Sequence, residues 1–279
     1  MNPWKKNRAG KSEPSGEAPE PPVDALETGP MRIARYLSQC GIASRRKAEE
    51  LVDQRRVQVN GVTLLEKGTV VTPGVDQVLV DGKPVELPTG GEETWMYHKP
   101  IEVLVTTHDP QGRPTVFDHL PVMLRPLKGR LKPVGRLDFM SEGLLLLTTD
   151  GNLANRLMHP RYEVEKEYEI VLREEIDASE HAKMIQGVVD EGERLMAKVV
   201  ERIPVLSTGE EIDRGFGYRV VLGEGRNRHI RRMLTALGKT LYRLRRIRSG
   251  SITLGNLQPG GWRKLRSSEL VGLIEGDVE

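Results

Sequence analysis

The stretch Val134-Gly-Arg-Leu-Asp138-Phe-Met-Ser-Glu-Gly143, which leads directly into Leu144-Leu-Leu-Leu147, decides the fold of this chain. A leucine run bounded by turn residues, with Gly143 before it and Asp150-Gly151 after it, is typical of a strand in the centre of a core. Asp138 would then lie on a polar loop that the core holds in place, where catalytic groups are often found. Taken alone, the stretch favours a plainer interpretation, in which Asp138 only caps a turn.

Composition narrows the class of protein. The chain has 279 residues, of which 37% are hydrophobic and 29% charged, which fits two modest domains. A single cysteine, Cys40, excludes an intrachain disulfide and a cysteine metal cluster, and the six histidines lack ligand spacing, so we expect no metal site. No apolar stretch approaches the length of a membrane span, and the N-terminus has no apolar signal region. We therefore expect a cytoplasmic protein that does not contact membranes.

The distribution of charge is more informative than the net charge of +2. Acidic residues are concentrated in the N-terminal tail and over 163–180, and basic residues in two short stretches. Local basic clusters on a nearly neutral chain indicate a localised site for a polyanion.

The chain divides into a disordered tail over 1–30, a small domain over 31–86, a linker over 87–94, a larger domain over 95–266 and a C-terminal tail over 267–279. In the small domain we expect two short helices followed by hairpins. Ser44 is a good N-cap for the second helix, and Asn60-Gly61 and Asp81-Gly82 are hairpin turn signals.

The larger domain should alternate strands and helices. We expect strands at 101–106, 144–147, 163–172 and 218–222, and helices at 151–158, 178–188 and 229–237. Alternation over 163–172 places Tyr168 on the inward face of its strand and the glutamates on the other face. The plainer interpretation of Tyr168 is an ordinary core tyrosine.

The second basic stretch runs from Glu224 through Leu234 and on to Arg248, with arginines at the start of a helix. Positive charge there is unfavourable for the helix dipole. An anion should compensate, either a carboxylate such as Asp138 or RNA phosphates.

Three segments of the small domain resemble the S4 RNA-binding domain: Arg32-Ile-Ala-Arg-Tyr-Leu-Ser, Gly41-Ile-Ala-Ser-Arg-Arg-Lys-Ala and Arg56-Val-Gln-Val-Asn-Gly. The resemblance implies that the second helix faces RNA with its basic residues. The matching residues are Arg32, Arg45, Arg46 and Lys47. The plainer alternative is a solvated basic helix face.

Motifs along the larger domain resemble the bacterial rRNA pseudouridine synthases of the RsuA type, nearest to the RluB group that acts on large-subunit rRNA. They are His98-Lys-Pro100, Asp109-Pro-Gln-Gly-Arg-Pro-Thr-Val, Gly135-Arg-Leu-Asp138, Asp150-Gly-Asn-Leu-Ala-Asn-Arg-Leu-Met-His-Pro160, Glu165-Lys-Glu-Tyr168, Glu224-Gly-Arg-Asn-Arg-His-Ile-Arg-Arg-Met-Leu234 and Gly260-Gly-Trp262. Several motifs in one order are more specific than any single motif. The resemblance covers residues 31–266.

The resemblance implies an α+β protein: a small S4 domain, then a synthase domain with a mainly antiparallel mixed sheet flanked by helices. It assigns Asp138 as the catalytic carboxylate, Tyr168 to the target uracil, Arg231 to an ion pair with Asp138, and Leu234 to the pocket wall. Two positions depart from the usual pattern. His98 replaces an asparagine and His229 a glutamine or glutamate, which puts substrate preference in question.

The implied reaction breaks the bond from ribose C1′ to uracil N1 and joins C1′ to C5, and it needs one carboxylate and no cofactor. The implied partner is ribosomal RNA, large-subunit rRNA or its assembly intermediate, acted on by a monomer. Candidates for RNA contacts in the larger domain are Arg113, Arg136, Arg226 and Arg228. Two alternatives stay open: a non-catalytic S4-type RNA-binding protein, and a glycoside hydrolase that uses Asp138 with Glu142.

Overall fold

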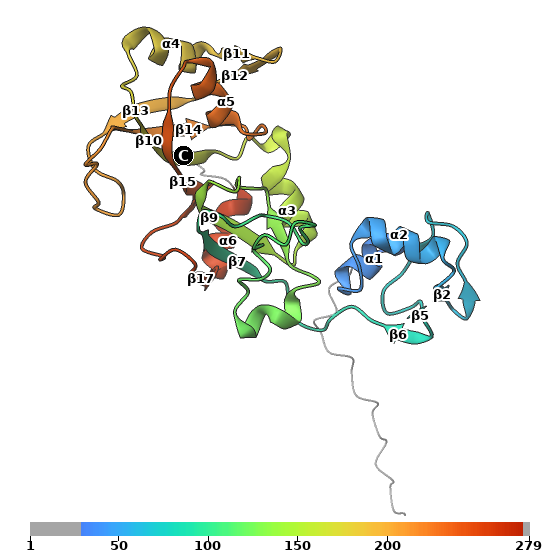
Figure 1. The fold of residues 1–279 in the computed structure, drawn as a ribbon. Helices are drawn as coiled ribbons and strands as arrows, with labels where there is room; N and C mark the ends of the chain where they lie inside the picture. Colours follow the sequence, from blue (N-terminus) through green and yellow to red (C-terminus); the bar gives the residue numbers. More distant parts are fainter. Residues whose placement is uncertain (1–28, 276–279) are drawn as a thin grey trace, which may run out of the picture.

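The computed structural model describes residues 29–275, and these contain two separate sets of hydrophobic cores. One core is built entirely from residues between Met31 and Leu87, and the others from residues between Trp95 and Leu273. Figure 1 shows the first part in blue, joined to the larger part by a single connecting segment. Most of the disordered tail predicted over 1–30 lies outside the described residues.

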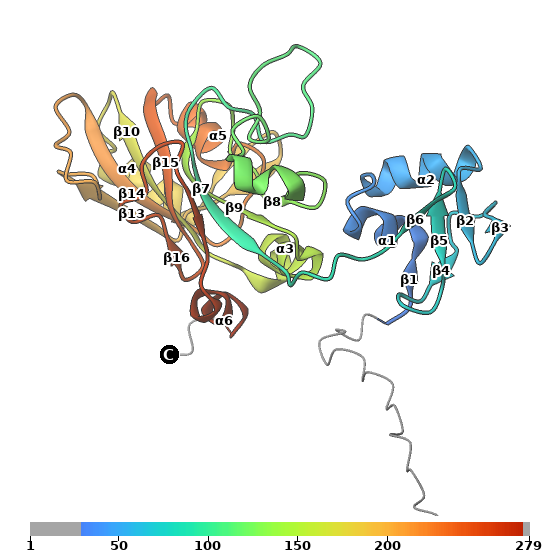
Figure 2. The same ribbon diagram turned by 90° about the horizontal axis from the view of Figure 1, so that it is seen from below.

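The N-terminal domain packs two helices against two small antiparallel sheets, one of β1 and β4 and one in the order β3-β2-β5-β6 (Figure 2). Its elements are β1 (Met31–Arg32), α1 (Ile33–Gln39), α2 (Arg45–Asp53), β2 (Val57–Val59), β3 (Val62–Thr63), β4 (Val70–Val71), β5 (Val78–Val80) and β6 (Lys83–Val85). Ser44 caps α2 as predicted, since its side chain accepts from the Lys47 amide. Both predicted hairpin turns are confirmed, and the residues of Asn60-Gly61 and Asp81-Gly82 all have positive φ.

The larger domain is built on a nine-stranded sheet that is antiparallel except where β15 runs parallel to β9. This confirms the predicted mainly antiparallel mixed sheet. In sheet order the strands are β13 (Val199–Ile203), β14 (Phe216–Leu222), β10 (Lys166–Leu172), β15 (Leu241–Ser249), β9 (Glu142–Thr148), β7 (Thr94–Lys99) and β17 (Trp262–Lys264). Two short strands extend it: β8 (Lys132–Val134) pairs with β9, and β16 (Ile252–Thr253) with β15.

The leucine run forms the centre of β9, and all four side chains are buried, as predicted. Successive side chains of a strand point to opposite faces of the sheet. Leu145 and Leu147 accordingly belong to the main core, and Leu144 and Leu146 to a second core on the other face. Because both faces are apolar, β9 is a fixed base for the loop that precedes it.

Helices cover both faces of this sheet, and Figure 2 shows α5 and α6 on opposite sides of the strands. α4 (Ala178–Gln186) and α5 (His229–Ala236) contribute to the main core, and α3 (Gly151–Met158) and α6 (Ser267–Glu275) to the second core. The remaining elements are η1 (Val122–Leu127), η2 (Pro160–Tyr162) and the hairpin β11 (Val188–Asp190) with β12 (Glu193–Leu195). Within residues 29–275, none of the helices has the length and apolarity to span a membrane.

Three predictions about local structure need correction. Residues 101–106 are a loop and not a strand, because Glu102 has a φ of 61° and the buried Lys99 ammonium binds the carbonyls of Pro100 and Val103. The helix predicted over 178–188 ends at Gln186, and Val188 is the first residue of β11. The segment placed in a C-terminal tail forms α6 as far as Glu275, because Leu273 packs into the second core.

Candidate functional site: a carboxylate and an arginine at a small cavity

The loop that carries Asp138 is held at several points. Leu137 is buried in the main core, the Glu102 amide donates to the Phe139 carbonyl at 2.7 Å, and the Ser141 amide donates to the Asp138 carbonyl at 3.0 Å. At the end of the loop Gly143 has a φ of 105°, and a Cβ there would lie 2.2 Å from the Arg246 carbonyl oxygen. Only glycine allows β9 to approach β15 so closely, so this approach fixes where the loop meets the sheet.

Asp138 faces Arg231 of α5. Asp138 Oδ2 lies 3.5 Å from Arg231 Nε, and the Arg231 Nη2 group donates to the Met140 carbonyl at 2.7 Å and to Ser141 Oγ at 3.2 Å. The side chain of Asp138 is 34% exposed and that of Arg231 20%. Burial lowers the pKa of the Arg231 guanidinium, and the Asp138 carboxylate opposes that shift. The arginine, anchored to the carboxylate's own loop, therefore presents a fixed positive charge to it.

A small cavity of about 70 Å³ lies at this ion pair. Its walls are Arg136, Leu137, Asp138, Ser141, Tyr168, Leu222, Gly225, Arg226, Arg228, His229, Ile230, Arg231 and Leu244. A volume of that size holds about two water molecules, whereas a pyrimidine ring needs more room. The side chains of Arg136, Arg226 and Arg228 line this cavity and are exposed.

Tyr168 is 9% exposed and lines the cavity, so it is both a core residue and a wall of the site. Leu234 was expected at the wall of the same cavity. It is buried in the main core and does not line the cavity. Ile230, one helical turn earlier on α5, stands at the wall in its place. Spacing along the helix could not distinguish these two positions, because both lie on its apolar face.

Two buried polar residues extend the site. Lys99 is fully buried, and burial lowers its pKa to about 8, against the attraction of the Asp138 and Glu142 carboxylates. In the sequence, Lys99 is noticeable only as part of the His98-Lys-Pro100 motif. Its position at the end of an apolar strand, just before Pro100, is the feature that could have indicated its burial. His229 is 4% exposed and lines the cavity, and burial lowers its pKa, so the neutral imidazole is favoured.

His98, the other residue that departs from the usual pattern of the family, lies outside this cavity. It is buried on β7, and its Nδ1 atom lies 2.6 Å from the Leu257 carbonyl oxygen. Burial lowers its pKa as well. His229 is therefore the departure from the usual pattern that stands at the site itself.

The remaining candidate arginines of the larger domain differ in their partners. Arg226 pairs with Glu224 at 2.8 Å, and Arg113 pairs with Asp109 and stands 5.8 Å from the centre of the Phe139 ring, beside Asp138. Arg136 and Arg228 are exposed, and neither has a carboxylate partner in the part of the chain that the structure describes. These two side chains therefore offer uncompensated positive charge at the rim of the cavity.

The basic stretch extends to Arg248 in the sequence, but most of its arginines on β15 are paired within the protein. Arg243, Arg245 and Arg248 lie on β15 and pair with glutamates, of which Glu142 is on β9 and Glu165, Glu167 and Glu169 lie on or just before β10. Their charges are neutralised within the sheet and are not offered to a ligand. In α5 only Arg231 meets Asp138, and Arg232 pairs with Asp190 and Glu193.

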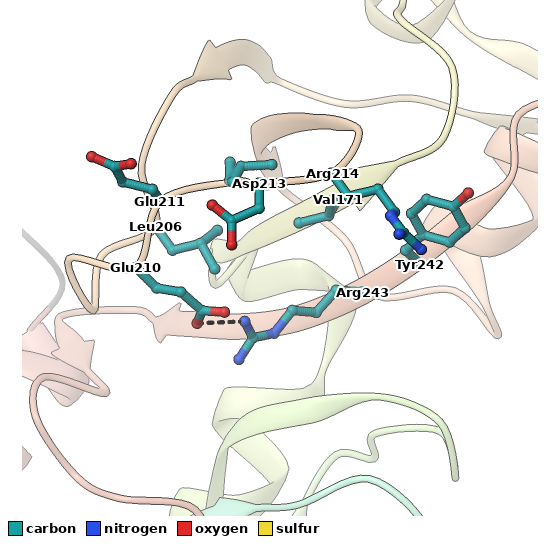
Figure 3. A pocket seen from close by; sticks show the side chains of 9 residues that line it. Val171, Leu206, Glu210, Glu211, Asp213, Arg214, Tyr242 and Arg243 are labelled. Carbon is teal, nitrogen blue, oxygen red and sulfur yellow. Dashed lines mark hydrogen bonds and ion pairs between the residues drawn. The ribbon is translucent and has the colours of Figure 1, made fainter.

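A larger cavity of about 440 Å³ lies elsewhere, beside the loop that connects β13 to β14 (Figure 3). Its walls include Glu210, Glu211 and Asp213, and its Arg243 already pairs with Glu210. Arg214 also lines the cavity, so its three carboxylates outnumber its two guanidinium groups by one, and charge does not favour an RNA phosphate there. Among residues 29–275, no group of three or more His, Cys, Asp or Glu side chains could hold a metal ion.

The four candidate cations of the N-terminal domain lie away from Asp138. Arg32 is exposed at the end of β1, and Arg45, Arg46 and Lys47 form the exposed first turn of α2. None of them pairs with a carboxylate within residues 29–275. All four side chains are exposed, and the three on α2 offer adjacent positive charges that suit contact with a polyanion.

Comparison with known proteins agrees with this geometry. Residues 93–236 match the family described as RNA pseudouridylate synthase, and residues 31–76 match the S4 domain. A protein named "Ribosomal large subunit pseudouridine synthase B" from Escherichia coli (strain K12) is 40% identical over 240 residues, which are 84% of this chain and 79% of that protein. An "Uncharacterized RNA pseudouridine synthase" from Aquifex aeolicus (strain VF5) is 39% identical over 246 residues, 88% of this chain and 94% of that protein.

The fold comparison points the same way. A solved structure titled "Crystal structure of pseudouridylate synthase" matches with a TM-score of 0.60 at 25% identity, and covers 87% of this chain and 99% of that one. The resemblance seen in the motifs is thereby confirmed. This chain belongs to the RNA pseudouridylate synthase family, with an S4 domain in front of the synthase domain.

Proposed function

We propose that this enzyme converts a uridine of large-subunit ribosomal RNA to pseudouridine, with Asp138 as its catalytic carboxylate. The observation that carries the proposal is the Asp138–Arg231 pair at the mouth of a cavity walled by Tyr168. The relatives named as large-subunit synthases, 40% identical over most of the chain, support the choice of ribosomal RNA.

The residue types suit the chemistry. The C1′–N1 bond breaks, a C1′–C5 bond forms, the proton on C5 leaves and N1 gains a proton, so no electrons are transferred. An ionised carboxylate can attack C1′, or can remove a sugar proton to begin an elimination, and either route needs Asp138 as the anion. Arg231 holds that anion in place through its contacts to Met140 and Ser141.

The base must leave its stack before it can reach Asp138, which costs a few kcal/mol. Stacking of the uracil on Tyr168 can offset about 1–3 kcal/mol of that cost. Arg136 and Arg228 stand at the rim without carboxylate partners among the described residues. They are suited to hold the phosphates on either side of the flipped nucleotide.

The S4 domain extends the contact with RNA through Arg32, Arg45, Arg46 and Lys47. We assign the substrate as large-subunit rRNA or its assembly intermediate, acted on by a monomer in the cytoplasm. Arg113, which stands over Phe139, and Arg226 complete the set of proposed RNA contacts in the synthase domain.

Pseudouridine mapping tests this proposal. Unmodified rRNA, free or in assembling subunits, is treated with wild-type protein, Asp138→Asn or the control Glu191→Gln, which removes one charge from a side chain that is 84% exposed. Carbodiimide adducts then stop primer extension at each new pseudouridine. We expect one new stop in large-subunit rRNA with wild type and Glu191→Gln, and none with Asp138→Asn. RNA binding without any stop would indicate a non-catalytic RNA-binding protein.

A further inference from the structure

The two domains meet at a small junction where both sides are positively charged. Arg35 of α1 donates to the Asn152 side chain of α3 at 3.1 Å, which joins the domains directly. The backbones also approach closely, since a Cβ on Gly129 would lie 2.5 Å from the Gly41 carbonyl oxygen. Next to these contacts lie Arg45 on one side and Lys132, the first residue of β8, on the other.

Lys132 is the centre of this junction. Its ammonium lies 3.8 Å from the position that a Cβ on Gly151 would take, so it stands at the first residue of α3, the positive end of that helix. Burial lowers the pKa of Lys132, and the charges of Arg45, Arg35 and Arg130 lower it further. Glu92 opposes the shift, but it also contacts Thr149 and Arg130.

Of the three guanidinium groups that act on the half-buried Lys132 ammonium, only that of Arg130 pairs with a carboxylate among the described residues, Glu92 at 3.8 Å. The charges of Arg35, Arg45 and Lys132 repel one another unless a further anion lies between them. Between β15 and β10, by contrast, Arg245 and Arg248 are balanced by glutamates. Arg45 and Lys132 have no carboxylate partner within residues 29–275. The imbalance at the junction therefore favours a ligand that brings negative charge.

We propose that a phosphodiester of the substrate RNA binds in this junction, held by Arg35, Arg45, Arg130 and Lys132. The inference rests on the proposed RNA substrate and adds a site that joins the two domains. RNA fits better than a small anion, because the free cations continue from Arg45 to Arg46 and Lys47 along the first turn of α2. A phosphate bound by both domains would fix the S4 domain relative to Asp138 and set which uridine arrives there.

The salt dependence of RNA binding tests the site. Full-length protein is titrated with an unmodified large-subunit rRNA transcript at several salt concentrations, and the slope of log affinity against log salt is measured. We expect Arg45→Gln with Lys132→Gln to reduce the slope by about 0.7 to 1 for each phosphate that the variant no longer neutralises. Affinity should fall about tenfold or more at low salt.

A matched control removes the same charge elsewhere. Lys83→Gln with Lys183→Gln changes two exposed lysines, one on β6 and one on α4. This control should leave the slope within error of wild type. Equal slopes for the junction variant and wild type would overturn the proposal, and so would an equal reduction by both double variants.

Coupling between the two substitutions gives a second readout. If Arg45 and Lys132 hold the same phosphate, the loss of affinity in the double variant will be smaller than the sum of the two single losses. Strictly additive losses would contradict a shared phosphate. Binding is measured independently of chemistry, so the two proposals can fail separately. If wild type gives the pseudouridine stop but the junction variant has an unchanged salt slope, only the junction site is refuted. If the junction variant has a reduced slope but wild type gives no stop, only the catalytic proposal is refuted.

Discussion

At the scale of single residues, Asp138 depends on Arg231 in two ways. The guanidinium brings positive charge to the carboxylate, and its second nitrogen group binds the Met140 carbonyl and Ser141 Oγ of the same loop. A fixed charge at a site that becomes water-excluded acts more strongly than the same charge in solvent. Arg231 is therefore expected to affect the reaction more than RNA binding.

Arg231→Met should reduce single-turnover pseudouridine formation by about 10²-fold or more, with a much smaller change in RNA affinity. Arg231→Lys retains the charge without the planar fork, and it should fall between wild type and Arg231→Met. Single-turnover rates at saturating enzyme, alongside RNA titration, separate the two effects. Loss of affinity with an unchanged rate on bound RNA would show that Arg231 binds substrate and does not support Asp138.

At the scale of elements, β10 and β15 are joined by charge as well as by backbone hydrogen bonds. Arg245 and Glu169 have side chains that are 2% and 5% exposed, and they sit opposite each other in the paired strands. Glu169 also accepts from the Ser207 amide at 2.6 Å, and Arg245 donates to Ser207 Oγ at 3.2 Å. This buried network ties the loop after β13 to the centre of the sheet.

Glu169→Gln should destabilise the protein by about 3–5 kcal/mol, because it leaves the Arg245 charge buried without a partner. The control is Asp81→Asn in the exposed pair Arg56–Asp81, where we expect a loss below about 1 kcal/mol. Asparagine also tolerates the positive φ of position 81. Denaturant unfolding measures both. Similar small losses would mean that solvent reaches the Glu169 pair.

At the scale of the whole molecule, the cores of the two domains are built from separate stretches of the chain. The contacts between them are few and polar at the junction of Arg35 with Asn152. Each domain should therefore fold without the other. Without the N-terminal domain, the enzyme would lack the basic surface of α2 for binding RNA.

Deletion of residues 1–86 should leave the synthase domain folded and reduce the second-order rate constant for rRNA about 10- to 100-fold, through weaker binding. The turnover rate of saturated RNA should change little. Circular dichroism and melting curves check the fold, and kinetics at limiting and saturating RNA separate affinity from turnover. An unchanged second-order rate constant would count against an RNA-binding role for the S4 domain.

The sequence by itself determined the features that depend on local chemistry and on the pattern of apolar residues. The leucine strand, the Ser44 cap and the positive-φ turns follow from which conformations those residues allow. The order of the motifs was enough to recognise the family.

Only the tertiary structure decided which residues meet. The charges of 243–248 looked available in the sequence, but pairing between β15 and its neighbours in the sheet placed most of them against glutamates. The segment expected as a strand at 101–106 is a loop in which Glu102 has a positive φ and buried Lys99 binds the Val103 carbonyl, a contact that no local pattern encodes. Leu234 and Ile230 share one helix face, and packing alone placed Ile230 at the cavity. Long-range pairing settles these outcomes because the stabilisation of a buried charge or carbonyl depends on partners far away in the chain.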